Sequence, residues 1–186
     1  SNYGVSYLRD AAERWSIQSN QVAYNLLWRV VEHEIQPVCV ERGISLLPYS
    51  SIAQGLLAGK FRRPEDVPSG RARTRHFSAQ RPETRHGESG AERRTFEAVD
   101  RVRTIAREAG LPMARLALAW LLRQPGVASV IVGARNPEQA RQNAAAGDVE
   151  LSDDTLEALN RATEPLKAAF DTNADMWQSD SRMERP

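Results

Sequence analysis

The sequence has 186 residues, 41% of them hydrophobic, with 25 Lys and Arg against 24 Asp and Glu. This length fits a single domain, residues 1–186, and the apolar content is too high for a disordered chain. The net charge of +1 argues against a nucleic-acid partner. No apolar run approaches the ~18 residues of a membrane span. A single cysteine, Cys39, is typical of a reducing, cytoplasmic compartment.

Hydrophobic periodicity predicts helices that alternate with short apolar strands. In chain order these are a helix over residues 5–15, a strand over 17–24, a helix over 26–42, a strand over 44–49, helices over 92–109 and 113–123, a buried strand over 127–132, a helix over 136–146 and a last helix that begins after Ser152. Gly43 is a natural stop for the second helix, and Pro37 predicts a kink or a second helix start within it. Beyond Pro165 we expect an irregular tail, residues 167–186, anchored by three residues. These are Phe170, Met176 and Trp177.

A long segment without periodicity, residues 61–91, separates the two halves of the pattern. It contains seven arginines: Arg62, Arg63, Arg71, Arg73, Arg75, Arg81 and Arg85. A loop of this length is usually functional or disordered. Two interpretations are open: a mobile, solvated loop, or a lid that carries positive charge over an anion.

Strands that alternate with helices predict right-handed crossovers and a parallel sheet. Three strands make a narrow sheet, whereas a barrel of this class takes eight strands and typically ~250 residues. The chain also begins at Ser1-Asn2-Tyr3 rather than at Met. We therefore expect an α/β chain that forms an incomplete part of a (β/α)8 TIM barrel, as a fragment or a processed piece.

Ligands of parallel α/β folds bind at the carboxyl ends of the strands. Gly133 and Arg135 follow the third predicted strand, and Asn136 then caps a helix, which is a suitable place for a phosphate. Tyr49 and Ser50 end the second strand, where a ring face and free backbone N–H groups are available. Two structural alternatives remain open: an ordinary connection with a helix cap for Gly133, Arg135 and Asn136, and a core position for Tyr49.

Asn20 and Gln21 end the first strand, and a carboxamide there either pairs with a ligand amide or satisfies local backbone groups. No histidine or cysteine spacing indicates a metal site, and neither a P-loop nor a G-x-S-x-G motif is present. Cys39 lies on an apolar helix face and is expected to be inert core.

Four segments resemble motifs of the aldo/keto reductase family. Residues 21–27, QVAYNLL, resemble its NQVEYN segment, and residues 48–60, PYSSIAQGLLAGK, resemble AYSPLAQGLLTGK. Residues 131–143, IVGARNPEQARQN, resemble IPGASSPEQLEEN, and residues 1–3 resemble the SNF that ends the fifth barrel strand. The resemblance implies the second half of a barrel whose enzymes reduce aldehydes and ketones with NADPH.

The resemblance also assigns cofactor-binding residues. They are Ser1, Asn2 and Gln21 at the nicotinamide carboxamide, Tyr49 against the nicotinamide ring, Ser50, Ile52, Gln54 and Lys60 at the pyrophosphate, Arg71 (or Arg73) from the long loop, Gly133, Arg135 and Gln139 around the adenosine 2′-phosphate, and Gln142 and Asn143 at the adenine. Arg135 stands where many relatives carry Ser, which favours NADP over NAD. Gln142 replaces a usual Glu, so the adenine contact is expected to be weaker.

The catalytic Asp, Tyr, Lys and His of the family lie on its first four strands, and none of them can be placed in this sequence. We therefore assign no catalytic residue and expect the chain alone to be inactive, as the NADPH-binding half of an enzyme that acts on a small carbonyl substrate. A non-catalytic, NADP-binding regulatory subunit of the same fold is the alternative, and an unstable truncation product with an open sheet edge is a third. The sequence specifies neither the carbonyl substrate nor the oligomeric state.

Overall fold

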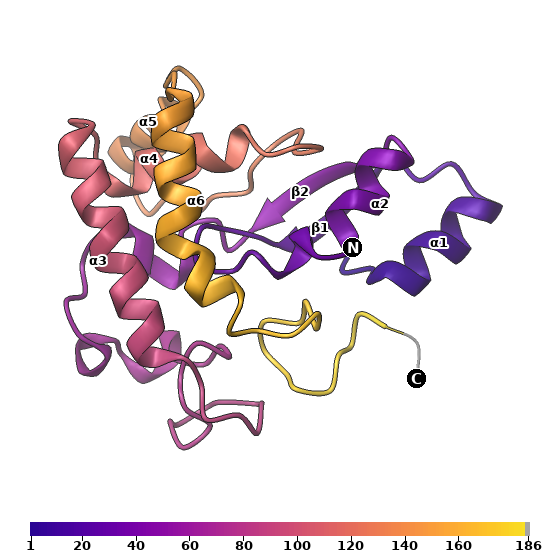
Figure 1. Cartoon of the computed structure of the whole chain (residues 1–186), viewed down its shortest axis with the longest axis horizontal. Coiled ribbons are helices and arrows are strands. Elements are labelled where there is room, and N and C mark those ends of the chain that lie inside the picture. The colour runs from indigo at the N-terminus through magenta and orange to yellow at the C-terminus, as the bar shows by residue number, and fades with distance from the viewer. Residues whose placement is uncertain (185–186) are drawn as a thin grey trace.

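The centre of the molecule is a pair of parallel strands, β1 (Ser19–Ala23) and β2 (Ser45–Tyr49) (Figure 1). The structure, a computed structural model, describes residues 1–184. The two strands are in register from Ser19 opposite Ser45 to Ala23 opposite Tyr49. Both lie inside the predicted ranges, 17–24 and 44–49, and their parallel direction confirms the predicted crossover.

Two further segments flank this pair, residues 1–2 beside β1 and residues 126–131 beside β2. Next to β1, the Asn2 N–H donates to the Gln21 carbonyl at 2.8 Å. Next to β2, the Leu46 N–H donates to Gly126 O at 2.7 Å and the Ile131 N–H donates to Pro48 O at 2.8 Å. The segment 126–131 runs parallel to β2, so it ends at the same edge of the sheet as β1 and β2, and Asn2 lies beside Gln21 near that edge.

The prediction of a buried strand over residues 127–132 is wrong both in the strand and in its burial. The segment makes one parallel bridge, Leu46 to Val127, rather than a continuous strand. Ile131 is 44% exposed. Among the described residues no strand pairs with the outer edge of this segment, so its β-branched side chains are covered from one side only.

Six helices surround the strands within residues 1–184. They are α1 (Val5–Arg14), α2 (Ile35–Glu41), α3 (Glu92–Glu108), α4 (Met113–Leu122), α5 (Pro137–Ala144) and α6 (Asp153–Lys167). In Figure 1, α3 and α6 lie side by side at one end of the molecule, and α1 lies at the other. Helix α4 is apolar on most sides, as the sequence predicted, and Leu116 and Trp120 within it are fully buried. These helices build the core that holds the strand ends in place.

The predicted helix over residues 26–42 is wrong in its first half. The Asn25 Oδ1 accepts hydrogen bonds from the backbone N–H groups of Leu27, at 2.8 Å, and Trp28, at 3.0 Å, and so closes a tight turn. Helix α2 begins only at Ile35, which puts Pro37 in the first turn, where a missing N–H costs nothing. Gly43, at a φ of 65°, ends the helix as predicted.

The predicted helix caps after the third extended segment are confirmed. Asn136 accepts from the Gln139 N–H at the start of α5, and Ser152 accepts from the Thr155 N–H at the start of α6. Helix α6 continues through Pro165, so the tail begins at residue 168 rather than 167. The tail has no helix or strand up to residue 184, and the last two residues of its predicted range lie outside the described residues.

The long loop is not fully solvated. Two short 3-10 turns, Pro64–Asp66 and Ser69–Arg71, interrupt it, and Arg75, His76 and Phe77 are buried. Arg75 donates to the carbonyl oxygens of Asn173 and Asp175 and so ties the loop to the tail.

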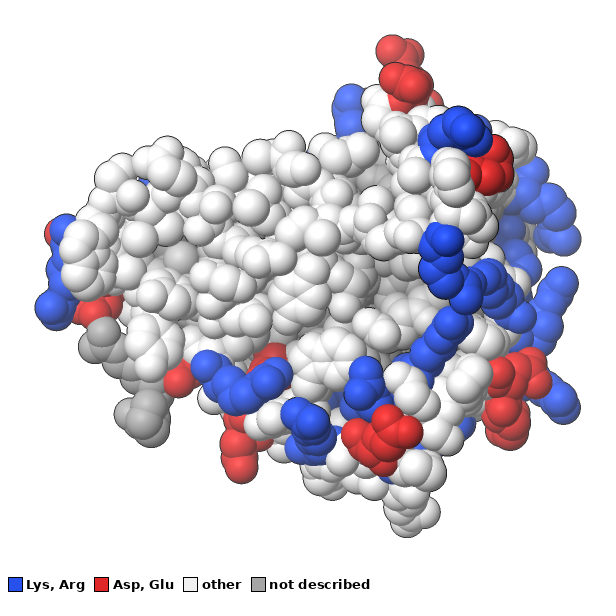
Figure 2. All heavy atoms as spheres, turned by 180° about the vertical axis from the view of Figure 1, so that it is seen from behind, with Lys and Arg blue, Asp and Glu red and all other residues white. Residues whose placement is uncertain are grey.

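Charged side chains are unevenly distributed over the surface. On the face opposite to that of Figure 1, uncharged side chains cover the middle, while Lys and Arg gather toward the end that carries α3 to α6 and along the lower edge (Figure 2). Within residues 1–184, no helix has both the length and the apolar character to cross a membrane.

Candidate functional site

A cleft of about 520 Å³ opens where β2 and the segment 126–131 end. We call it the cation-lined cleft. Ten of the fourteen predicted site residues line it. They are Ser50, Ile52, Gln54, Lys60, Arg71, Gly133, Arg135, Gln139, Gln142 and Asn143.

Positive charge dominates this cleft. Lys60, Arg71 and Arg135 line it, and its lining contains no Asp or Glu. None of these three cations has an ion-pair partner among residues 1–184. A cleft with three unneutralised cations is suited to an anion with several phosphate oxygens.

The backbone that forms one wall is strained. Ser50, Ala53 and Gln54 all have left-handed φ values, 52°, 47° and 55°. Such conformations cost roughly 1–2 kcal/mol each in non-glycine residues and persist where the surroundings over-determine them. Here the Asn25 Nδ2 donates to Ser50 O at 3.1 Å, and the Ser51 Oγ donates to Ile131 O at 2.5 Å.

Gly55 ends the backbone stretch from Ser50 that the sequence offered to a pyrophosphate, and it makes room for Arg71, a contact that the sequence analysis missed. Its φ is 97°, and a Cβ built on it would lie 3.3 Å from Arg71 Nη1. Arg71 also lies over the Phe61 ring, at 6.0 Å from its centroid. The loop therefore presents Arg71, and not Arg73, to this cleft. The glycine directly after Gln54 is the sequence signal that could have identified this close approach.

The opposite wall is the start of α5. The Arg135 N–H donates to Gln139 Oε1 at 3.0 Å, and the Asn143 Nδ2 donates to Gly133 O at 3.2 Å. The Gln142 Nε2 donates to Glu138 Oε1 at 2.9 Å within the helix. These bonds hold the turn that carries Arg135 beside the positive end of the helix dipole. A Cβ on Gly133 would meet no atom within 4 Å, so space remains in front of this turn.

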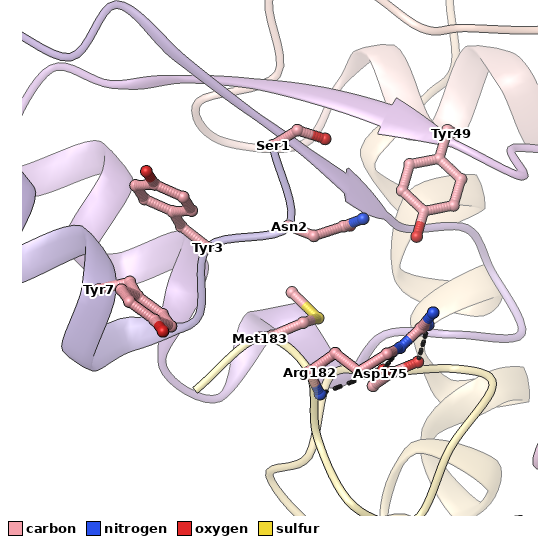
Figure 3. A pocket seen from close by; sticks show the side chains of 8 residues that line it. All are labelled: Ser1, Asn2, Tyr3, Tyr7, Tyr49, Asp175, Arg182 and Met183. Carbon is pink, nitrogen blue, oxygen red and sulfur yellow. Dashed lines mark hydrogen bonds and ion pairs between the residues drawn. The ribbon is translucent and has the colours of Figure 1, made fainter. Parts of the chain in front are cut away.

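Three of the remaining predicted residues, Ser1, Asn2 and Tyr49, line a second cavity, of about 440 Å³, which we call the tyrosine pocket (Figure 3). The other residues around it are Tyr3, Tyr7, Asp175, Arg182 and Met183. Gln21, the fourteenth predicted residue, lies behind Ser1, whose Oγ is 3.4 Å from Gln21 Oε1.

Asn2 and Tyr49 face each other across this pocket (Figure 3). The Asn2 Oδ1 is buried and has no hydrogen-bond partner within residues 1–184. Burial raises the pKa of Tyr49, although hydrogen bonds from Trp177 and Asn2 oppose the shift, so the phenol is protonated at neutral pH. The unpartnered Asn2 carboxamide oxygen fits a ligand that offers an N–H, as an amide does.

The sequence analysis missed the two charged tail residues of this pocket, Asp175 and Arg182. Arg182 donates to both carboxylate oxygens of Asp175, at 2.6 and 2.8 Å (Figure 3). Burial would raise the pKa of Asp175, but Arg182 and the Trp177 N–H hold it below its ordinary value. No periodicity marks the tail, so the sequence held no signal that would place these residues beside Tyr49.

The two cavities together fit the cofactor that the sequence analysis implied. The cation-lined cleft supplies charge and backbone space for phosphates, and the tyrosine pocket supplies an aromatic ring beside an unsatisfied amide oxygen. Within residues 1–184, no three His, Cys, Asp or Glu residues are placed to hold a metal ion.

The sequence pattern of the aldo/keto reductase family matches residues 1–164. The NADH-specific methylglyoxal reductase of Escherichia coli is 29% identical over 167 residues, which cover 90% of this chain and 48% of that protein. A probable voltage-gated potassium channel subunit beta of Arabidopsis thaliana is 33% identical over 130 residues, 69% of this chain and 38% of that one.

Among solved structures, the glycerol dehydrogenase of Gluconobacter oxydans superposes with a TM-score of 0.65 at 24% identity, over 82% of this chain and 44% of that chain. This likeness shows an α/β fold that corresponds to part of that protein. The chain spans about half the length of the curated relatives it matches most extensively.

Proposed function

This chain belongs to the aldo/keto reductase family, and on that premise we propose that it is the NADP-binding part of an oxidoreductase that reduces aldehyde or ketone carbonyls. The observation that carries the proposal is the gathering of ten expected site residues around one cleft with three cations and no carboxylate. A bound nicotinamide dinucleotide would supply the hydride.

The residues of this chain would bind and orient that cofactor. Asn2, with Ser1 and Gln21 beside it, would hold the nicotinamide carboxamide through its unpartnered oxygen. Tyr49 would lie against the nicotinamide ring and leave its other face for the carbonyl substrate. Lys60 and Arg71, with Ser50, Ile52 and Gln54, would hold the pyrophosphate.

The adenosine end would lie against the start of α5. Gly133, Arg135 and Gln139 would surround the 2′-phosphate, and Gln142 and Asn143 would contact the adenine. Arg135 supports NADP, because a guanidinium pairs with a phosphate dianion far better than with a hydroxyl. The name of the Escherichia coli relative states NADH, which makes the coenzyme preference the first property to measure.

The test is fluorescence titration of the protein with NADPH and with NADH. NADPH is expected to bind more tightly, and Arg135→Glu is expected to weaken NADPH binding by about 10–100-fold while it leaves NADH nearly unchanged. Arg94→Glu, at an exposed position on α3 outside the cleft, is the charge-matched control. Equal affinity of the wild type for both coenzymes would contradict the assignment of Arg135, and no binding of either would contradict the proposal itself.

The second candidate is a non-catalytic, NADP-binding regulatory subunit, which the Arabidopsis relative favours. Both candidates bind the cofactor, so turnover by the complete protein separates them. Reading the coding DNA upstream of Ser1 gives the sharpest answer: an in-frame Asp, Tyr, Lys and His at the ends of further strands supports the reductase. Their absence, with NADPH bound but not oxidised in the presence of aldehydes, supports the regulatory subunit.

A further inference from the structure

A third cavity lies beside Tyr49, on the side of the long loop. It encloses about 320 Å³, and we call it the arginine pocket. Its lining residues are Asn2, Tyr49, Arg73, Glu83, Arg85, Trp177 and Arg182. It shares Asn2, Tyr49 and Arg182 with the tyrosine pocket, and it shares no residue with the cation-lined cleft. Its arginines come from the loop and from the tail, two segments that are far apart in the sequence.

Two of the three arginines carry charge that the protein does not neutralise. Arg182 is paired with the buried Asp175. Arg85 is exposed and has no ion-pair partner within residues 1–184. The nearest carboxylate to Arg73 is that of Glu83, at 3.9 Å; the two side chains are 40% and 55% exposed, so solvent weakens this long pair.

Arg73 is also held in a fixed orientation. Its guanidinium carbon lies 5.8 Å from the centroid of the Trp177 ring, and its Nε is buried without a hydrogen-bond partner in the described part of the chain. A buried, unpaired N–H is costly unless a ligand satisfies it. A guanidinium that lies over a ring and has only a weak ion pair offers a bidentate site for a carboxylate or a phosphate.

We propose that the arginine pocket binds an anionic group of the carbonyl substrate, so that the substrate is an aldehyde or ketone that carries a carboxylate or a phosphate. This inference rests on the proposed function, because Asn2 and Tyr49 are the residues assigned there to the nicotinamide. A ligand whose anionic group contacts Arg73 and Arg85 has its other end beside Tyr49. The cofactor phosphates have their own cations, Lys60, Arg71 and Arg135, in the separate cleft.

The test compares matched anionic and neutral aldehydes by calorimetry, with the protein saturated with NADP⁺ so that no reduction occurs. Succinic semialdehyde and its methyl ester form the carboxylate arm, and glyceraldehyde phosphate and glyceraldehyde form the phosphate arm. In at least one arm the anion is expected to bind about tenfold more tightly than its neutral partner, and the arm with the larger ratio identifies the group.

Single substitutions then assign the effect to the pocket. Arg73→Gln and Arg85→Gln are each expected to weaken binding of the anion about tenfold and to leave binding of the neutral aldehyde and of NADP⁺ unchanged. Arg62→Gln, an exposed arginine of the same loop outside all three cavities, is expected to change none of these affinities.

The outcomes separate this inference from the proposed function. If NADP⁺ binds but neither arm prefers the anion, or if Arg62→Gln weakens anion binding as much as the two pocket variants do, the arginine pocket is not a substrate site. If NADP⁺ does not bind, the proposed function fails. In that case the same titrations are made without cofactor. The pocket is then supported only if the anion binds more weakly to the Arg73 and Arg85 variants than to the wild type.

Discussion

His76 is the buried residue whose protonation most clearly opposes folding. Its Nε2 lies 2.8 Å from Leu27 O, and its Nδ1 lies 2.9 Å from Thr74 Oγ1. Because a carbonyl oxygen only accepts, Nε2 carries the proton and Nδ1 accepts from the threonine hydroxyl. Burial is the largest cause of a pKa of about 4 for His76; the Leu27 hydrogen bond opposes this shift, and the charges of Arg75 and His86 add to it.

The protein is therefore expected to lose stability as the pH falls below the ordinary histidine pKa. Below ~6.5 the unfolded chain binds a proton that the folded chain does not, so unfolding becomes easier, by about 2 kcal/mol at about pH 5. His76→Gln should flatten this dependence. Urea unfolding at about pH 7.5 and about pH 5 measures it, with the exposed His33→Gln as control. A slope that is the same in both variants would show that His76 is not the group responsible.

Among the turns and helices, the strained turn after β2 is the element on which the proposed cofactor site depends most. Gly55→Ala places a side chain at a φ of 97° and within 3.3 Å of the Arg71 guanidinium. We expect a loss of about 1–2 kcal/mol in the free energy of unfolding, together with weaker NADPH binding because Arg71 is displaced. Thermal unfolding and NADPH titration measure the two effects.

Gly70→Ala is the matched control for this prediction. Gly70 lies in the long loop, next to Arg71 in the sequence, its φ is outside the left-handed region, and a Cβ there meets no atom within 4 Å. It should change neither quantity by more than the ordinary effect of a surface substitution. If Gly55→Ala is equally harmless, the close approach of Arg71 has no energetic importance.

Elements specified by local signals could be predicted from the sequence. Asn136 and Ser152 each place a side-chain acceptor in front of free N–H groups, and Gly43 supplies a left-handed residue, so each acts within one turn. The turn at Asn25 could not be predicted, because apolar spacing over residues 26–42 suits a helix and the decisive bond comes from one amide side chain.

The proposed site likewise has one part that could be predicted from the sequence and one part that could not. Ser50 to Lys60 and Gly133 to Asn143 are contiguous motifs after extended segments, and parallel pairing brings them together, so the sequence suffices to predict a shared cleft. Arg182 and Asp175 reach Tyr49 only because an irregular tail folds back over the strand ends. No periodic pattern encodes that path, so this part of the site required the structure.

At the scale of the whole molecule, the tail closes the tyrosine pocket by binding the start of α1. The Glu184 carboxylate accepts from the Val5 N–H at 2.7 Å and from the Ser6 N–H at 3.2 Å, and it also accepts from the Ser6 hydroxyl. A negative charge is favourable at the positive end of a helix. The Gly4 N–H adds a bond to Met183 O at 2.7 Å.

Glu184→Gln is expected to loosen this closure. Removing the charge should cost about 0.3–1 kcal/mol, and trypsin should cleave more rapidly after Arg182, because local opening of the tail becomes easier. Mass spectrometry of timed digests measures the rate. Asp180→Asn removes the same charge from an exposed tail position as the control. Identical cleavage rates in the two variants would mean that the α1 contact does not hold the tail.

The bond between Val5 and Glu184 joins residues 179 positions apart. Closing so long a loop carries a high entropic cost, and contacts of this range form late. During synthesis on the ribosome, α1 and both strands emerge long before residue 184 does. The wall of the tyrosine pocket is therefore completed only after residue 184 has left the ribosome, and until then Tyr3, Tyr7 and Tyr49 of the nascent chain lack the cover that the tail provides.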